Sequence, residues 1–296
     1  MKKLLLVASL MLVAILGLSS CGGKAEPKDA LESIKQHGYI LVSTDPNYAP
    51  QSSLNTEGKR PADTKCPSDA LTAVELQGFD VEVAHAIGDA LSVETCFATP
   101  GWDTITAGSW ASKWDVSVGS MTITTDRLKV LNFSVPYYYT PAVVAVGNDS
   151  GFKSLDDLAG KPLCAGVSTT YETWINNGDL GLPASSIYSK VPAGVTAVPL
   201  ETDQECAQAL IRKDFVGYVT SQTVVNANIA AGLPVVILGS PVYSEDLAAA
   251  FDKSSTLSTD SLRAEVDKLF TAMHGDGRLS GISKKWFNED LTQAPK

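Results

Sequence analysis

Hydrophobic and polar positions follow two different spacings along the first half of the chain. Short apolar runs at Tyr39–Thr44, Val93–Phe97 and Trp114–Gly119 are typical of buried strands. Between the first two runs, apolar residues recur at every fourth position from Phe79 to Leu91, which predicts a helix with one apolar face. A short helix is predicted within residues 103–111. Strands that alternate with helices in this way predict an α/β fold with a largely parallel sheet.

The same alternation returns in the second half of the chain. Apolar runs at Ala142–Val146, Leu163–Val167, Phe215–Thr220 and Pro234–Leu238 predict four more strands. The capping box TDQE at Thr202–Glu205 marks the start of a helix among them. We therefore expect a second α/β unit, and a chain of 296 residues is long enough for two domains.

The first residues form a targeting segment rather than part of the fold. A basic start precedes the apolar run Leu4–Leu18, which is too short to span a membrane comfortably, so a secretory signal peptide is predicted over residues 1–20. A membrane anchor is the alternative. The sequence LSSC, which ends at Cys21, resembles a bacterial lipobox and implies cleavage before Cys21 and lipidation of its thiol. Residues 21–36 would then be a lipidated tether that holds the protein at a membrane face.

Charge and motif content argue against several classes of function. The formal net charge is −10 and no basic stripe is present, so nucleic acid is not an expected partner. The three histidines are scattered, and no spacing of cysteine and histidine suggests a metal site. No phosphate-binding loop, HExxH or GxSxG pattern occurs. We therefore expect no metal and no cofactor.

Five cysteines are present, and Cys21 is the candidate for lipidation. The remaining even number suggests disulfides, as is usual in an exported chain. The sequence alone permits three connectivities. We favour Cys66–Cys96 and Cys164–Cys206, because each pair falls inside one expected domain. Free buried thiols are the alternative.

Polar and aromatic residues follow several of the expected strands at their carboxyl ends, where the ligand sites of open α/β sheets lie. A guanidinium such as that of Arg127 can hold a carboxylate in a bidentate fork, and nearby hydroxyls can add hydrogen bonds. A helix start just after Val167 offers N–H groups that favour an anion. The candidate ligand-binding residues in this pattern are Asp45, Tyr48, Trp102, Ser120, Thr122, Arg127, Ser168 and Thr170.

Five stretches of the chain, taken in order, resemble the motifs of one protein family. They are LQGFDVEVAHAIGDAL, GWDTITAG, WDVSVGSMTITTDRLKVLNFSVPYY, SLDDLAGKPLCAGVSTT and MHGDGRLSGISKKWF. Together they resemble the family 3 solute-binding proteins of ABC transporters, the polar amino acid binders, over nearly all of residues 37–287. The resemblance implies a periplasmic-binding-protein-like fold of type II, with two α/β lobes, two hinge strands and a ligand cleft. It divides the chain into a first lobe (37–141), a second lobe (142–247) and a return to the first lobe (248–296).

The resemblance also implies a function, partners and residue roles. We expect a monomeric, extracytoplasmic receptor that closes on a small carboxylate ligand, above all an amino acid, and delivers it to a membrane permease. Arg127 matches the arginine that holds the ligand α-carboxylate, and Asp45 matches an acid that often contacts a cationic ligand side chain. Tyr48 and Trp102 match residues that pack on the ligand. Thr170 matches a second carboxylate donor, with Ser168 and Tyr171 beside it.

One position departs from the family pattern. Many members carry an aspartate that binds the ligand α-ammonium, and Ser221 stands in its place. The serine could bind the ligand or simply cap the next helix. Because a buried ammonium without a countercharge is costly, Asp45 or Glu172 would supply the charge, or the ligand is not an ordinary α-amino acid.

Two other functions are alternatives to the transport receptor. Some proteins of this fold resemble cyclohexadienyl or arogenate dehydratases, in which a cleft carboxylate acts as a general acid, and Glu172 lies where such an acid would sit. A glutamate in the first turn of a helix also suits the helix dipole without any catalytic role. The second alternative is a ligand-sensing module that acts through a partner protein.

Overall fold

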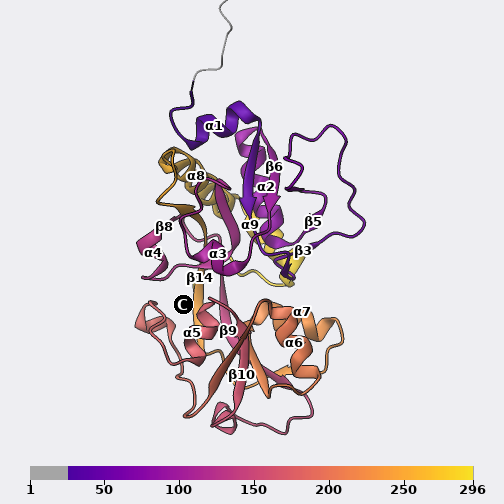
Figure 1. The fold of residues 1–296 in the computed structure, drawn as a ribbon. Coiled ribbons are helices and arrows are strands. Elements are labelled where there is room, and N and C mark those ends of the chain that lie inside the picture. Colours follow the sequence, from indigo (N-terminus) through magenta and orange to yellow (C-terminus); the bar gives the residue numbers. More distant parts are fainter. Residues whose placement is uncertain (1–25, 296) are drawn as a thin grey trace, which may run out of the picture.

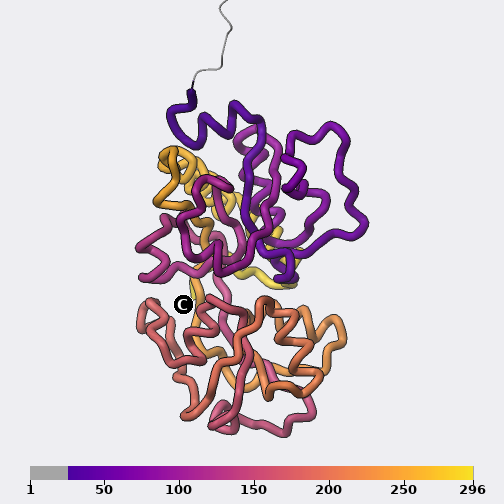
Figure 2. The backbone as a smooth tube through the Cα atoms, in the orientation of Figure 1, coloured from indigo at the N-terminus to yellow at the C-terminus, as the bar shows by residue number. Residues whose placement is uncertain are grey.

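A computed structural model describes residues 26–295 of the chain. It shows two α/β lobes, one above the other, with the backbone crossing between them (Figure 1). Figure 2 shows that the first and last parts of the chain share one lobe, whereas the middle part forms the other. The expected two-lobed α/β fold is therefore confirmed. The signal peptide predicted over residues 1–20 and the lipidation predicted at Cys21 lie outside the described residues.

Parallel strands form the centre of the first lobe, as the alternating pattern predicts. Strand β1 pairs in parallel with β6 on one side and with β7 on the other. Helices α2, α8 and α9 pack against one another beside these strands. The elements of this lobe are α1 (Ala30–His37), β1 (Tyr39–Ser43), β2 (Asn47–Tyr48), β3 (Ser52–Leu54), β4 (Leu71–Thr72), β5 (Leu76–Gln77), α2 (Phe79–Leu91), β6 (Glu94–Ala98), α3 (Trp102–Thr106), β7 (Val116–Thr122), α4 (Arg127–Val130), β8 (Leu131–Phe133), α8 (Asp260–Asp276) and α9 (Arg278–Phe287).

The core of the first lobe explains the spacing seen in the sequence. Phe79, Val83 and Ile87 of α2 are buried because residues four positions apart lie on one face of a helix. The Phe79 ring contacts Phe287 of α9, with 4.6 Å between the ring centroids. Through this contact the C-terminal helix α9 packs against the first lobe.

The second lobe repeats the arrangement with a smaller set of elements. Strand β10 pairs in parallel with both β11 and β12. The elements of this lobe are the 3₁₀ helix η1 (Leu155–Leu158), β10 (Pro162–Gly166), α5 (Thr170–Ile175), the 3₁₀ helix η2 (Ala184–Ser186), β11 (Thr196–Leu200), α6 (Asp203–Ile211), β12 (Gly217–Ser221), α7 (Gln222–Ala230) and β13 (Val235–Ile237).

Two long strands, β9 (Tyr138–Gly147) and β14 (Tyr243–Asp252), run from one lobe into the other. They pair with each other in antiparallel register, and they also pair with β12 of the second lobe and β7 of the first. The two lobes therefore share one continuous sheet. The domain boundaries expected at residues 141–142 and 247–248 fall inside these two strands.

The expected tether extends less far than predicted. Residues 21–36 are expected to form the lipidated tether, but helix α1 begins within them at Ala30, after Asp29, whose side chain accepts a hydrogen bond from the Glu32 amide. Ile34 of this helix is buried in the core of the first lobe. The prediction overlooked that one apolar residue and an N-terminal cap are enough to dock a short helix.

Both expected cysteine pairs are disulfide-bonded. Cys66–Cys96 ties the long loop between β3 and β4 to strand β6. Cys164–Cys206 ties strand β10 to helix α6. Each bond therefore fixes a segment of its own lobe and leaves the connection between the lobes unconstrained.

Candidate ligand-binding site

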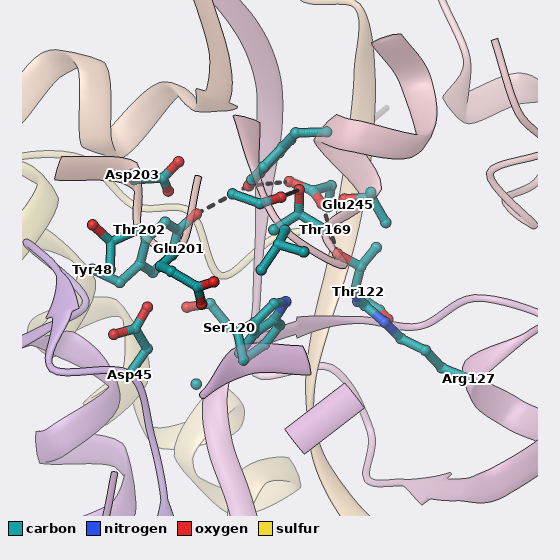
Figure 3. A pocket seen from close by; sticks show the side chains of 16 residues that line it. Asp45, Tyr48, Ser120, Thr122, Arg127, Thr169, Glu201, Thr202, Asp203 and Glu245 are labelled. Carbon is teal, nitrogen blue, oxygen red and sulfur yellow. Dashed lines mark hydrogen bonds between the residues drawn. The ribbon is translucent and has the colours of Figure 1, made fainter. Parts of the chain in front are cut away.

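A cavity lies between the two lobes, in the place where the ligand sites of two-lobed α/β proteins are found. Its residues come from the first lobe, the second lobe and the connecting strand β14 (Figure 3). The lining consists of Asp45, Tyr48, Trp102, Gly119, Ser120, Thr122, Arg127, Gly166, Val167, Thr169, Thr170, Tyr171, Glu201, Thr202, Asp203 and Glu245.

Arg127 is the only cationic side chain among the described residues that line the cavity. It is buried at the start of α4, and its guanidinium donates to the Thr122 carbonyl (3.0 Å) and, across the cleft, to the Ser168 carbonyl (3.2 Å). Burial lowers the pKa of Arg127, although the nearby Glu245 carboxylate opposes this shift. The guanidinium is thus held in place by carbonyl groups from both lobes, and a ligand carboxylate would find it already oriented.

Aromatic rings from both lobes border the cavity. The Tyr48 and Tyr171 hydroxyls lie 3.0 Å apart and connect the lobes. The Trp102 ring lies 5.7 Å from the Arg127 guanidinium carbon, a distance at which a cation is attracted to a ring face. The Trp102 indole N–H is buried and has no hydrogen-bond partner within residues 26–295. These rings supply apolar walls, and the Trp102 indole supplies a donor at the Arg127 side of the cavity.

Glu245 lies at the centre of the site, and sequence reasoning missed it. Its carboxylate is buried and accepts hydrogen bonds from the hydroxyls of Thr122 (2.6 Å), Thr170 (2.8 Å) and Tyr171 (2.9 Å). Burial raises the pKa of Glu245, while these hydroxyls and Arg127 favour the charged form. One carboxylate on β14 therefore joins the first lobe to the second.

Three further carboxylates, those of Asp45, Glu201 and Asp203, lie on the side of the cavity away from Arg127 (Figure 3). Asp45 follows β1 in the first lobe, whereas Glu201 and Asp203 stand at the start of α6 in the second. The cavity is therefore bipolar, with its one cation at one side and a group of acids at the other. Of these acids, only Asp45 was expected from the sequence.

Comparison with known protein families identifies the family to which the chain belongs. Residues 40–289 match the family described as bacterial extracellular solute-binding proteins, family 3. The chain belongs to this family. The match spans both lobes and confirms the resemblance seen in the motifs.

Curated relatives within the family 3 solute-binding proteins cover most of the chain. The L-cystine-binding protein TcyJ of Escherichia coli (strain K12) is 27% identical over 89% of this chain and 88% of its own length. The L-cystine-binding protein TcyA of Bacillus subtilis (strain 168) is 28% identical over 99% of this chain and 100% of its own length.

Solved structures agree with the fold of this family 3 protein. A mutant of ArgBP from T. maritima has a TM-score of 0.71 and 25% identity, covering 88% of this chain and 100% of that one. An ancestral arginine-binding protein bound to glutamine has a TM-score of 0.69 and 27% identity, covering 85% and 99%.

Most of the ligand-binding residues expected in this family 3 protein come together in the cavity. Those that line it are Asp45, Tyr48, Trp102, Ser120, Thr122, Arg127, Thr170 and Tyr171. The Ser120 hydroxyl is already engaged, because it donates to Asp80 and accepts from Tyr138. Ser168 stands outside the lining, and it meets the site through its carbonyl, which accepts from Arg127.

The prediction that Ser221 contacts the ligand is corrected by the structure. Ser221 is fully buried outside the cavity lining, and its hydroxyl bonds to those of Thr140 and Thr223. It also accepts from the Thr223 amide as the N-cap of α7. The Ser221 side chain therefore caps helix α7, in agreement with the alternative interpretation.

Glu172, the candidate countercharge or general acid, also lies outside the lining. Its carboxylate accepts a hydrogen bond from the Ser168 amide, 2.8 Å away, in the turn that begins α5. Within residues 26–295, no group of three or more histidine, cysteine or acidic side chains could hold a metal ion. None of the helices described there is long and apolar enough to cross a membrane.

Proposed function

We propose that this family 3 protein is the receptor of an ABC importer and captures an amino acid between its lobes. The curated relatives named above bind L-cystine, and the related solved structures include amino acid binders. The observation that carries the proposal is the buried Arg127 guanidinium, which stands beside Trp102 and Thr122 in a cleft lined by both lobes. A guanidinium in this setting suits a carboxylate ligand, because it offers paired donors in one plane.

The α-ammonium of such a ligand requires a different countercharge from the one that the family uses. In an amino acid the ammonium is attached next to the carboxylate, so it must lie close to Arg127. Glu245 is the carboxylate that faces Arg127, whereas Asp45 lies on the other side of the cavity. An ionised carboxylate can accept about four hydrogen bonds, and the Glu245 carboxylate already accepts three from hydroxyl groups. We assign the remaining position to the ligand ammonium.

The position of Glu172 supports binding without catalysis. A general acid must lie within hydrogen-bond reach of the atom that it protonates. Glu172 instead caps the turn at Ser168 and is absent from the cavity lining. A structural relative is an ancestral amino acid-binding protein, a precursor of cyclohexadienyl dehydratase, but at 24% identity it shows the fold alone.

The family and the sequence also support a location for the protein outside the cytoplasm and a membrane permease as its partner. The family consists of extracellular proteins, and the LSSC sequence ending at Cys21 supports a lipid anchor on the outer face of a membrane. The partner would be a membrane permease that recognises the closed lobes of a single receptor molecule.

A binding screen with matched variants tests this proposal. Residues 24–296 would be mixed with each L-amino acid and with its des-amino carboxylate, and thermal unfolding would be followed. A ligand at about 1,000 times its dissociation constant adds roughly 4 kcal/mol to the free energy of unfolding. We expect Arg127→Ala to abolish the shift. Because Arg127 also donates to two backbone carbonyls, the ligand-induced shift is counted from the unfolding temperature of the ligand-free variant itself. Arg212→Ala is the control, because Arg212 is exposed and pairs only with Asp214 at the surface. Tight binding retained by Arg127→Ala would refute the site.

A further inference from the structure

Asp203 is a buried carboxylate with one oxygen unsatisfied. It is the first residue of α6, its side chain lines the cavity, and only 6% of the residue is exposed. Its Oδ2 atom accepts from the Thr220 hydroxyl at 2.9 Å. Its Oδ1 atom is shielded from solvent and has no hydrogen-bond partner in the described part of the chain.

A buried oxygen without a partner lowers the stability of the fold, and the capping of α6 does not depend on it. Burying a polar atom without a hydrogen bond typically costs about 1–3 kcal/mol, and more for a charged group. The first turn of α6 is already capped by the reciprocal hydrogen bonds of Thr202 and Glu205. The arrangement becomes reasonable if a donor enters the cavity and bonds to Oδ1.

The surroundings of Asp203 favour a positively charged donor. Four carboxylates and one guanidinium line the cavity, so its charged groups carry an excess of negative charge. Burial, together with the carboxylates of Asp45 and Glu245, raises the pKa of Asp203 to about 7, although the hydrogen bond from the Thr220 hydroxyl lowers it. A cation placed here would be attracted by several acids, whereas a neutral group would leave their mutual repulsion in place.

The acids come from opposite lobes. Asp45 belongs to the first lobe, and Asp203 and Glu201 belong to the second, with α6 lying against β2. Closing the lobes therefore brings like charges together. A cation between Asp45 and Asp203 would convert this repulsion into attraction, so that closure depends on the ligand's charge.

We propose that Asp203, with Asp45 and Glu201, forms a subsite for a cationic group at the side-chain end of the ligand. The chain then selects amino acids whose side chains end in an ammonium or a guanidinium. This inference rests on the proposed function, in which Arg127 and Glu245 hold the α-carboxylate and α-ammonium. L-cystine is a probe of this selectivity, because its far end carries a carboxylate beside an ammonium, and these acids would repel that carboxylate.

Paired ligands that differ in one charge test the subsite. Dissociation constants for L-lysine and its neutral analogue L-norleucine, and for L-arginine and its neutral analogue L-citrulline, would be measured by calorimetry, with L-cystine as a further probe. We expect wild type to bind the charged member of each pair about tenfold to a hundredfold more tightly, as for a hydrogen bond to a charged group. In Asp203→Asn this preference should disappear, while binding of norleucine and citrulline stays near its wild-type value.

Asp115→Asn is the matched control. Asp115 also has a pKa raised by burial, to about 6, and its carboxylate accepts from the Leu41 amide outside the cavity. This variant should keep the wild-type preference. Equal binding within each pair, a preference for cystine, or an unchanged preference in Asp203→Asn would overturn the subsite and leave amino acid capture standing. If neither these amino acids nor any other amino acid in the screen bound to the protein, the proposed function itself would be overturned.

Discussion

At the scale of single residues, Glu245 determines how the site can hold a zwitterion. Its carboxylate takes hydroxyls from Thr122 in the first lobe and from Thr170 and Tyr171 in the second. Two of these hydroxyls were expected to face the ligand carboxylate. Because they donate to Glu245 instead, our proposal assigns the ligand carboxylate mainly to Arg127 and the ligand ammonium to Glu245.

We predict that Glu245→Gln removes the preference for amino acids over their des-amino analogues. Glutamine keeps the size and one acceptor oxygen but loses the charge, so the amino acid should bind about tenfold to a hundredfold more weakly. The des-amino carboxylate, which has no ammonium, should bind nearly as in wild type. Calorimetric titration of both ligands against wild type and Glu245→Gln gives the coupling free energy between the ligand ammonium and the Glu245 carboxylate.

Glu172→Gln is the control for this experiment, since Glu172 was the earlier candidate for the countercharge and lies outside the cavity. It should leave the preference unchanged. If Glu245→Gln weakened both ligands equally, Glu245 would only position Thr122 and Thr170.

Some of the residues that line the cavity could be predicted from the sequence, and others could not. Arg127, Tyr48 and Trp102 could be predicted because each follows the end of an expected strand and stands in a motif that resembles the family, whereas an arginine or aromatic near a turn is unspecific by itself. Asp203 and Glu245 could not, because most carboxylates are solvated surface groups. Their burial depends on which segments meet across the cleft, and that is a property of the folded chain.

At the scale of elements, Asp80 joins α2 to the strands behind the cavity. It is fully buried near the start of α2 and accepts from the hydroxyls of Ser120 (2.7 Å) and Tyr137 (2.8 Å). Burial raises its pKa from 3.8 to about 7, although both hydroxyls favour the charged form. The other titratable groups near it are the phenols of Tyr137 and Tyr138.

We predict that Asp80→Asn reduces the pH dependence of folding stability. In the unfolded chain Asp80 loses its proton near pH 4, whereas the folded protein keeps it until about pH 7. The contribution of Asp80 to stability is therefore full below pH 4, falls as the pH rises to about 7, and is then constant. The fall amounts to roughly 4 kcal/mol at most, and urea unfolding at pH 4.5 and pH 8 measures it.

Asp89→Asn provides a control on the same helix, because the Asp89 side chain is 70% exposed. That variant should keep the wild-type difference between the two pH values. An equal difference in Asp80→Asn would show that Asp80 is ionised in the folded protein throughout this range.

Elements with a clear apolar run or apolar spacing were predicted well, whereas strands whose buried positions include polar residues were missed in whole or in part. Helix α2 was found with its exact bounds because its apolar residues recur at helical spacing. Strand β14 was missed as an element, because nearly every residue in YSEDLAAAFD is buried, including Ser244 and Glu245, and no alternation marks it. Strand β9 was predicted only over its central part because Tyr138 and Thr140 precede the apolar run, although both are buried.

At the scale of the whole molecule, the lobes are closed and held by direct hydrogen bonds across the cleft. Gln51 of the first lobe donates to Thr223 of the second at 2.6 Å. The Thr125 amide of the first lobe donates to the Gly181 carbonyl of the second at 3.1 Å. Because β9 and β14 connect the lobes, these contacts report on closure rather than on the folding of either lobe.

Gly181 provides a way to oppose closure without touching the cavity. Its φ angle is +63°, and a Cβ atom added there would clash with the Thr125 hydroxyl oxygen across the cleft and lie 2.8 Å from the Thr125 amide nitrogen. Gly160, also in the second lobe, has a φ angle of +70° but open space around the same position. Alanine at either site carries the strain of the left-handed conformation, about 1 kcal/mol or somewhat more, so only the contact with the first lobe distinguishes them.

We predict that Gly181→Ala weakens ligand binding by at least about tenfold, whereas Gly160→Ala binds as wild type does. Both variants should lose a similar amount of unfolding free energy, because the strain in the second lobe is the same. The added repulsion arises only when the lobes meet, so it lowers the affinity of any ligand whose binding requires closure. Calorimetry gives the affinity, and small-angle scattering with saturating ligand shows whether Gly181→Ala stays more open. Equal affinities in the two variants would mean that the ligand is held without full closure, and that the contacts between Thr125 and Gly181 do not contribute to capture.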